Sequence, residues 1–166
     1  MEIDELYQEV ILDHFKRPRC RGCIDKPSAS LTLHNPLCGD QVELSVSVSK
    51  GRIVEIAFGG HGCSISQASA SMMSELCKGK TLEEIRKIGD SFKQMMRGEQ
   101  PGDALVTILG DAVALEGVRK FSARVKCAML AWEAIEKCML EAQAQDAQAN
   151  GALSHQIPGQ KTNEEH

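Results

Sequence analysis

The sequence predicts an α+β protein. Along the chain, one helix is followed by an antiparallel sheet of about three strands and then by a longer series of helices. Apolar and polar residues alternate without a break over residues 42–49, a pattern typical of a strand with one exposed face. From residue 65 onward, apolar residues instead recur every three or four positions, which indicates helices. Grouped strands followed by grouped helices favour the α+β class. The chain of 166 residues has the size of one domain.

Apolar residues at helical spacing predict a first helix over residues 3–15, which Pro18 ends. His14 lies on the apolar side of this helix, so we expect its ring to be packed and hydrogen-bonded. The strands are expected around residues 31–33, 42–48 and 54–58. Lys50 and Gly51 form the turn between the last two.

Two segments of the capping-box type, residues 64–67 and 81–84, predict the starts of the next two helices. Short helical pieces broken at Gly110 and Gly117 are expected over residues 104–118. These pieces bring the chain to its last long helix.

The last helix is predicted to start at about Arg124. Beyond Cys138 the chain becomes rich in Gln, Ala, Asn and Ser and loses its periodicity. Segments of such composition bury too little apolar surface to fold on their own. We therefore expect a domain over residues 1–140 and a low-complexity, disordered tail over residues 141–166.

Charge and hydropathy exclude several classes of partner. Residues 1–140 carry 18 basic and 19 acidic side chains, without the basic excess that binding to nucleic acid requires. The acidic start lacks the apolar run of a signal peptide, and no segment has the length of a membrane span. We expect a cytoplasmic protein with reduced thiols, in which seven cysteines indicate metal binding or reactivity rather than disulfides.

Four residues at turns and helix starts form a candidate metal site: Cys38, Asp40, Cys63 and Cys127. Gly39 allows the backbone to turn, so that Cys38 and Asp40 point the same way. Cys63 and Cys127 are each expected near a helix start, where the thiolate form is favoured. Three thiolates and a carboxylate suit tetrahedral zinc. Spacing alone also allows three unrelated structural cysteines.

The other cysteines do not fit this site. Cys77 and Cys138 lie too far along their helices from Cys63 and Cys127, and we expect both to be buried. Cys20 and Cys23 form a CxxC in a basic linker without a second CxxC. This pair is interpreted as incidental, with an accessory metal or redox role as the alternative.

Three segments resemble one known family: Asn35 to Asp40 (NPLCGD), Gly62 to Met73 (GCSISQASASMM), and Arg124 to Ala128 (RVKCA). Together they are similar to the IscU/NifU N-terminal family of iron–sulfur cluster assembly proteins, and more closely to its SufU branch. The resemblance runs from the first helix to about residue 138.

The resemblance implies a SufE/IscU-like fold, with helices on one face of the sheet and the metal site at one exposed end. It implies Zn²⁺ bound by Cys38, Asp40, Cys63 and Cys127. It also implies that a SufS-like, pyridoxal-phosphate cysteine desulfurase passes sulfur to Cys38 as a persulfide, for delivery to a downstream iron–sulfur scaffold. Arg124 is expected to tune charge at this site, as a second catalytic residue.

Two features favour the SufU branch over IscU. IscU-like chains have a histidine immediately before the third cysteine, where this chain has Lys126, a poor ligand at neutral pH. An extra segment before the third cysteine fits residues 97–121. His61 is unexplained, and its replacement of Asp40 at the metal remains an alternative.

Two other functions remain open. The same four residues suit a scaffold or carrier of a transient [2Fe–2S] cluster. A cysteine hydrolase in which Cys38 pairs with His34 or His61 is a further alternative, although no oxyanion-hole motif supports it.

Overall fold

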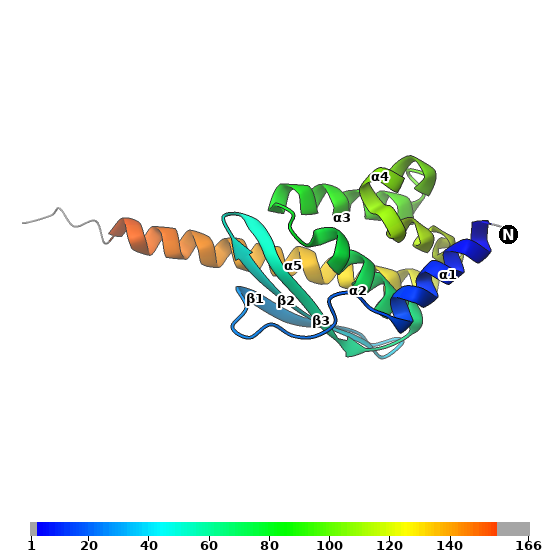
Figure 1. Cartoon of the computed structure of the whole chain (residues 1–166), viewed down its shortest axis with the longest axis horizontal. Helices are drawn as coiled ribbons and strands as arrows, with labels where there is room; N and C mark the ends of the chain where they lie inside the picture. Colours follow the sequence, from blue (N-terminus) through cyan, green and yellow to red (C-terminus); the bar gives the residue numbers. More distant parts are fainter. Residues whose placement is uncertain (1–2, 156–166) are drawn as a thin grey trace, which may run out of the picture.

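The computed structural model describes residues 3–155, which form a three-stranded sheet and a set of helices (Figure 1). The elements in chain order are α1 (Ile3–Lys16), β1 (Ala29–Asn35), β2 (Asp40–Ser49), β3 (Arg52–His61), α2 (Ser64–Cys77), α3 (Leu82–Arg97), the 3₁₀ helix η1 (Gly102–Leu105), α4 (Val106–Leu109), the 3₁₀ helix η2 (Gly110–Lys120) and α5 (Ser122–His155). The predicted α+β class and the three-stranded antiparallel sheet are confirmed.

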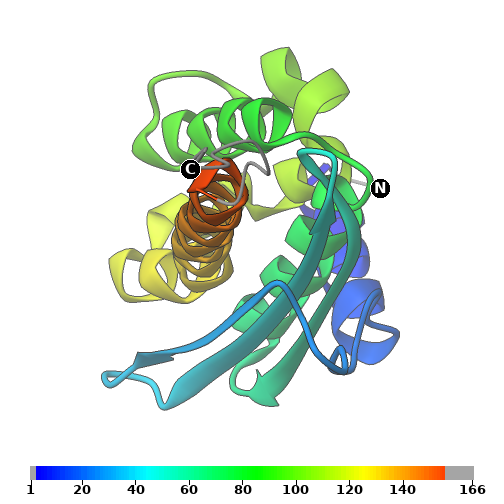
Figure 2. The same cartoon turned by 90° about the vertical axis from the view of Figure 1, so that its left-hand side faces the viewer.

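The sheet has the order β1-β2-β3, so β2 is its central strand. Val42, Leu44 and Val46 of β2 are buried on the face that α2 and α5 cover (Figure 2). Their alternation with more polar residues is the pattern that predicted this strand. The tight β2–β3 turn has positive φ at both Lys50 and Gly51, as expected for a two-residue hairpin.

The segment that contains the CxxC pair covers one edge of the sheet. The amide of Phe58 in β3 donates to the carbonyl of Cys20 at 3.0 Å, and the amide of Gly22 donates to the carbonyl of Phe58 at 2.9 Å. Cys20 is half-buried against the core, whereas Cys23 is exposed. This segment therefore satisfies backbone groups that an edge strand would otherwise expose.

His14 is fully buried, and both ring nitrogens have partners, as predicted. Nδ1 lies 2.8 Å from Oγ of Ser71 in α2, and Nε2 lies 2.8 Å from Oδ2 of Asp111 in η2. The histidine thus joins α1 to the two elements on which it packs.

Two predicted details of the helices are wrong. The N-cap of α2 is Cys63, whose Sγ accepts from the amide of Ser66, so residues 64–67 do not form a capping box. Gly117 does not interrupt η2, although Gly110 does separate η2 from α4. The capping box at the start of α3 is present, since Thr81 and Glu84 exchange both hydrogen bonds.

Helix α5 continues to His155, and residues 141–148 are helical where the sequence predicted disorder. Ala, Gln and Glu are strong helix formers, and they extend a helix that packing has already nucleated. Packing against the body ends at about Ala142, because residues 143–148 are exposed. Residues 156–166 lie outside the described part, and the division of the chain at residue 140 stays a prediction. None of the helices described is both long and apolar enough to cross a membrane.

Candidate metal centre

The β1–β2 hairpin positions the first two candidate ligands. Asn35 and Asp40 are paired across the strands, and the loop Pro36–Gly39 connects them. The Asn35 carbonyl accepts from the amide of Gly39 at 2.9 Å, and its side-chain Oδ1 accepts from the amide of Leu37 at 3.2 Å. Gly39 has φ 69°, a left-handed conformation that glycine adopts without strain. The loop leaves Cys38 exposed at the tip of the hairpin.

Asp40 is at the centre of the site because it begins the central strand. Its side chain is buried, and Oδ1 accepts from the backbone amide of Cys63 at 2.8 Å. Its Oδ2 accepts from the thiol of Cys38 at 2.9 Å and lies 3.6 Å from Sγ of Cys63. The carboxylate therefore connects the hairpin loop with the start of α2.

Gly62 allows this close approach between β2 and α2. Its φ is 154°, and a Cβ at this position would overlap Oδ1 of Asp40 and approach Oγ of Ser66 to 2.7 Å. Any side chain at residue 62 would therefore displace the carboxylate that holds Cys63 in place.

Helix α5 supplies the third thiol. Cys127 is fully buried, and its Sγ lies 3.1 Å from Sγ of Cys38. The amide of Asn35 points toward the same sulfur, with Nδ2 3.9 Å from Sγ. Three elements that are distant in sequence thus meet at one end of the molecule.

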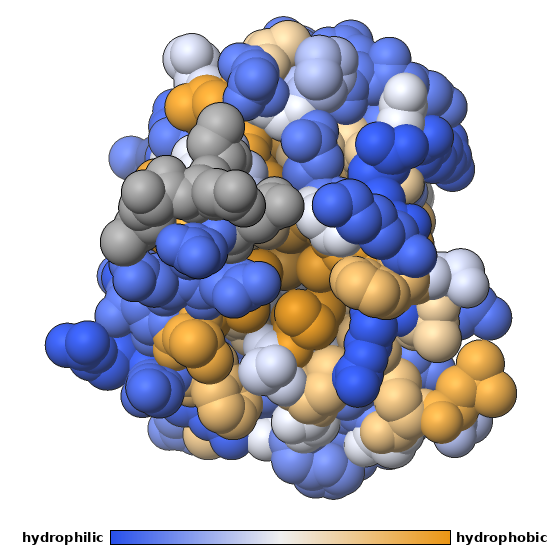
Figure 3. Space-filling model, turned by 90° about the vertical axis from the view of Figure 1, so that its right-hand side faces the viewer, coloured by the Kyte–Doolittle hydropathy of each residue, from blue (hydrophilic) through white to orange (hydrophobic). Residues whose placement is uncertain are grey.

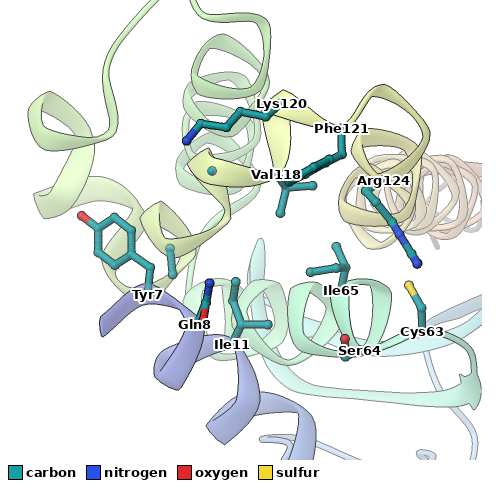
Figure 4. Close-up of a pocket in the computed structure, with 12 residues that line it drawn as sticks. Tyr7, Gln8, Ile11, Cys63, Ser64, Ile65, Val118, Lys120, Phe121 and Arg124 are labelled. Carbon is teal, nitrogen blue, oxygen red and sulfur yellow. The ribbon is translucent and has the colours of Figure 1, made fainter. Parts of the chain in front are cut away.

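Arg124, one turn before Cys127 on α5, adds a positive charge to this end (Figure 4). The electrostatic interaction with Cys63 is the largest influence on the Arg124 guanidinium and raises its pKa, followed by a hydrogen bond to the same residue. Cys127 also contributes to the raised pKa of Arg124. The predicted proximity of Arg124 to the cysteines is therefore present in the structure.

The buried groups of the site have shifted pKa values. Burial raises the pKa of the Cys127 thiol, and its hydrogen bonds with Cys38 and Asp40 raise it further. Burial also acts to raise the pKa of Asp40, but hydrogen bonds from Cys38 and from the amide of Cys63 outweigh it and lower the pKa. Asp40 is thus a carboxylate that accepts hydrogen bonds from the surrounding thiols.

The donor atoms have the spacing and chemistry of a small metal site. One donor atom each from Cys38, Asp40 and Cys127 lies within 4.8 Å of the other two. Cys63 lies at the edge of this group, next to Asp40. In a tetrahedral zinc site, ligand atoms are about 3.3–3.8 Å apart, given metal–ligand distances of about 2.0–2.3 Å. The separations of 2.9 Å between Cys38 and Asp40, 3.1 Å between Cys38 and Cys127, and 3.6 Å between Asp40 and Cys63 are close to this. The Cys63 sulfur lies more than 4.8 Å from at least one of the other two sulfurs, so it would have to move toward them for all four side chains to bind one zinc ion.

The remaining histidines and cysteines lie apart from this group. In the described part of the chain, the hydrogen bonds of Cys38 go to Asp40 and Cys127, and none goes to His34 or His61. This argues against a cysteine–histidine dyad, and His61 is not among the donor atoms gathered with Asp40.

Cys77 and Cys138 are fully buried in the core, as predicted, and burial raises the pKa of each to about 12.

Sequence reasoning did not assign a role to Asn35 or Gly62. Asn35 is buried, and its amide faces Cys127, although the Asn-Pro dipeptide indicated only a turn. The glycine-rich stretch before Cys63 was a signal for close backbone approach, but it did not identify the group that approaches.

Comparison with known proteins agrees with this geometry. The family described as NifU-like N terminal domain matches residues 6–128, which include all four candidate ligands and Arg124. The chain belongs to this family. The zinc-dependent sulfurtransferase SufU of Bacillus subtilis is 44% identical over 81% of this chain and 90% of its own length. The predicted resemblance to the SufU branch is therefore confirmed.

Other members of the NifU-like N-terminal family have scaffold names. The iron–sulfur cluster assembly scaffold protein IscU of Streptococcus pyogenes is 41% identical over 83% of this chain and 85% of its own length. A solved structure of an iron–sulfur cluster assembly scaffold protein for the SUF system, from Fervidobacterium islandicum, has a TM-score of 0.74 and 32% identity. That match covers 82% of this chain and 98% of the other.

Proposed function

We propose that this protein is a zinc-dependent sulfurtransferase of iron–sulfur cluster assembly, which accepts persulfide sulfur on Cys38 from a pyridoxal-phosphate cysteine desulfurase. One observation carries this proposal: the exposed Cys38 thiol lies within 3.1 Å of a buried thiol and 2.9 Å of a buried carboxylate. The sulfurtransferase name of the Bacillus subtilis relative supports the same conclusion.

Cys38, Asp40, Cys63 and Cys127 would hold the zinc ion. When bound, zinc supplies a positive charge that keeps the thiolates deprotonated at neutral pH. Three thiolates and one carboxylate carry two negative charges more than the ion neutralises. The exposed Arg124 guanidinium next to Cys63 and Cys127 offsets one of these two charges.

Differences in exposure select Cys38 as the sulfur acceptor. Cys127 is fully buried and Cys63 is half-buried, so Cys38 is the ligand that a partner protein reaches. The Cys38 thiolate attacks the outer sulfur of the persulfide on the desulfurase cysteine. A bond from Cys38 Sγ to that sulfur forms, the sulfur–sulfur bond of the donor breaks, and the donor cysteine leaves as a thiolate.

A scaffold for a transient [2Fe–2S] cluster is the second candidate function. The thiolate-rich set and the scaffold names of the IscU relatives favour it. Lys126 beside Cys127 disfavours it, because its ammonium group adds no fourth soft ligand at neutral pH. If the protein is a sulfurtransferase, a separate downstream scaffold would receive the sulfur that Cys38 carries.

Metal analysis of the purified protein, combined with desulfurase turnover, tests the proposed function. We expect a colourless protein with about one zinc per chain, which increases the turnover of a cysteine desulfurase from the same organism. Visible absorbance that disappears when iron is removed, without any effect on turnover, would instead establish the scaffold function.

Gly62→Ala should lower the affinity for zinc more than an alanine at another glycine with positive φ would. The new methyl group displaces Asp40, so we expect zinc affinity to fall about 10- to 100-fold, as for loss of a group that orients a ligand. The measurement is competition with a chromophoric chelator. Gly79→Ala is the matched control, since Gly79 also has positive φ (78°) but a Cβ there meets no atom within 4 Å. Equal affinities of the two variants would contradict this role of Gly62.

A further inference from the structure

A cavity of about 590 Å³ opens beside the candidate metal centre, between α1, the start of α2, the end of η2 and the first turn of α5. Its apolar walls include Ile11, Ile65, Val118 and Phe121. Figure 4 shows Arg124 and Cys63 facing each other at one side of the cavity and Tyr7 at the other. Whatever fills the cavity therefore also touches the edge of the metal centre.

The charged side chains at the cavity, apart from Cys63 of the candidate metal centre, are basic. Lys120 and Arg124 line it, and no aspartate or glutamate does. Both cations are exposed, and among the described residues neither forms an ion pair with a carboxylate, although Arg124 interacts with the sulfur of Cys63. Cations beside an apolar hollow favour a partner group that combines an apolar side chain with a carboxylate.

Exposed apolar side chains lie both at the cavity and beside Cys38. Phe121 is 62% exposed, and Leu37, next to Cys38, is 76% exposed. Figure 3, which faces the end of the molecule that carries α1 and the start of α5, shows apolar residues gathered inside a hydrophilic rim. A small ligand held in the cavity would leave the outer part of Phe121 in water, whereas a protein surface would cover it.

We propose that this cavity is the docking site for the cysteine desulfurase, and that it receives a segment with an apolar side chain next to an acidic one. The apolar group lies between Ile65, Val118 and Phe121, and the carboxylate pairs with Lys120. This inference rests on the proposed function, since it names where the sulfur donor binds. Docking here brings the donor to the same end of the molecule as Cys38.

The double variant Lys120→Glu/Phe121→Ala tests the docking site. Both side chains are exposed and neither is a candidate ligand, so the fold and the zinc content should be unchanged. Lys137→Glu/Leu140→Ala is the matched control on α5, where one exposed cation is reversed and one exposed apolar side chain is removed away from the cavity. Melting temperature and zinc content are measured for all three proteins.

Desulfurase turnover is then measured against the concentration of each protein. For Lys120→Glu/Phe121→Ala we expect the half-saturating concentration to rise about tenfold or more, with the maximal rate retained. For wild type this concentration should also rise with added salt, and less so for the variant, since an attractive charge is replaced by a repulsive one. The control variant should match wild type.

The turnover measurements distinguish a failure of the proposed function from a failure of the proposed docking site. If wild type does not increase turnover at any concentration, the proposed function fails. If wild type increases turnover but Lys120→Glu/Phe121→Ala saturates at the same concentration as the control, the docking site is wrong and the function stands. A fall in the maximal rate alone, at an unchanged half-saturating concentration, also overturns the docking site.

Discussion

The Cys38→Ala protein should still fold, but it should accept no sulfur from a cysteine desulfurase. Cys38 is exposed at the tip of the β1–β2 hairpin, and its side chain fills no part of the core. Its loss therefore removes the acceptor thiol without creating a cavity. With a stoichiometric amount of desulfurase persulfide, mass spectrometry should detect one added sulfur on wild type and none on the variant.

The Cys23→Ala protein is the control for this experiment. Cys23 is also an exposed cysteine, but it precedes the sheet and is not among the candidate ligands. It should accept sulfur as wild type does. Sulfur transfer to Cys38→Ala at the wild-type level would contradict the role of Cys38, and a loss in Cys23→Ala alone would move the acceptor to the CxxC pair.

Removal of the metal should lower the melting temperature by about 8–16 °C. The candidate ligands come from the β1–β2 hairpin, the start of α2 and helix α5, and they lie together only in the folded chain. Zinc at about 1,000 times its dissociation constant then stabilises the fold by about 4 kcal/mol. In a chain of this size each kcal/mol shifts the melting temperature by about 2–4 °C.

Calorimetry before and after chelation checks this prediction, and re-addition of zinc should restore the original value. Cys23→Ala should show the same shift as wild type. A melting temperature that chelation leaves unchanged would mean that these residues do not hold a metal that is coupled to folding.

Local pattern was sufficient to predict most of the fold. The alternation along β2 and the turn at Lys50-Gly51 defined the sheet, because both depend on backbone periodicity that the sequence records directly. The end of α5 was missed, since loss of apolar periodicity marks where packing ends rather than where the helix ends.

The candidate site was predictable as a set of residues but not as a geometry. Cys38 and Asp40 could be associated because one glycine separates them. The strand register that places Asp40 between the hairpin loop and Cys63 was not visible, nor was the approach of Asn35 to Cys127. Such contacts join residues that are distant in sequence, and no local pattern encodes them.

Helix α5 begins at the metal centre and leads away from it along the long axis of the molecule (Figure 1). From Cys127 to His155 the helix rises about 40 Å at 1.5 Å per residue. A fluorophore or a surface linker attached at His155 would therefore leave the end that carries the candidate metal centre open. Because of the same separation, energy transfer between such a fluorophore and a second one on a docked partner would measure how far the partner extends along the molecule.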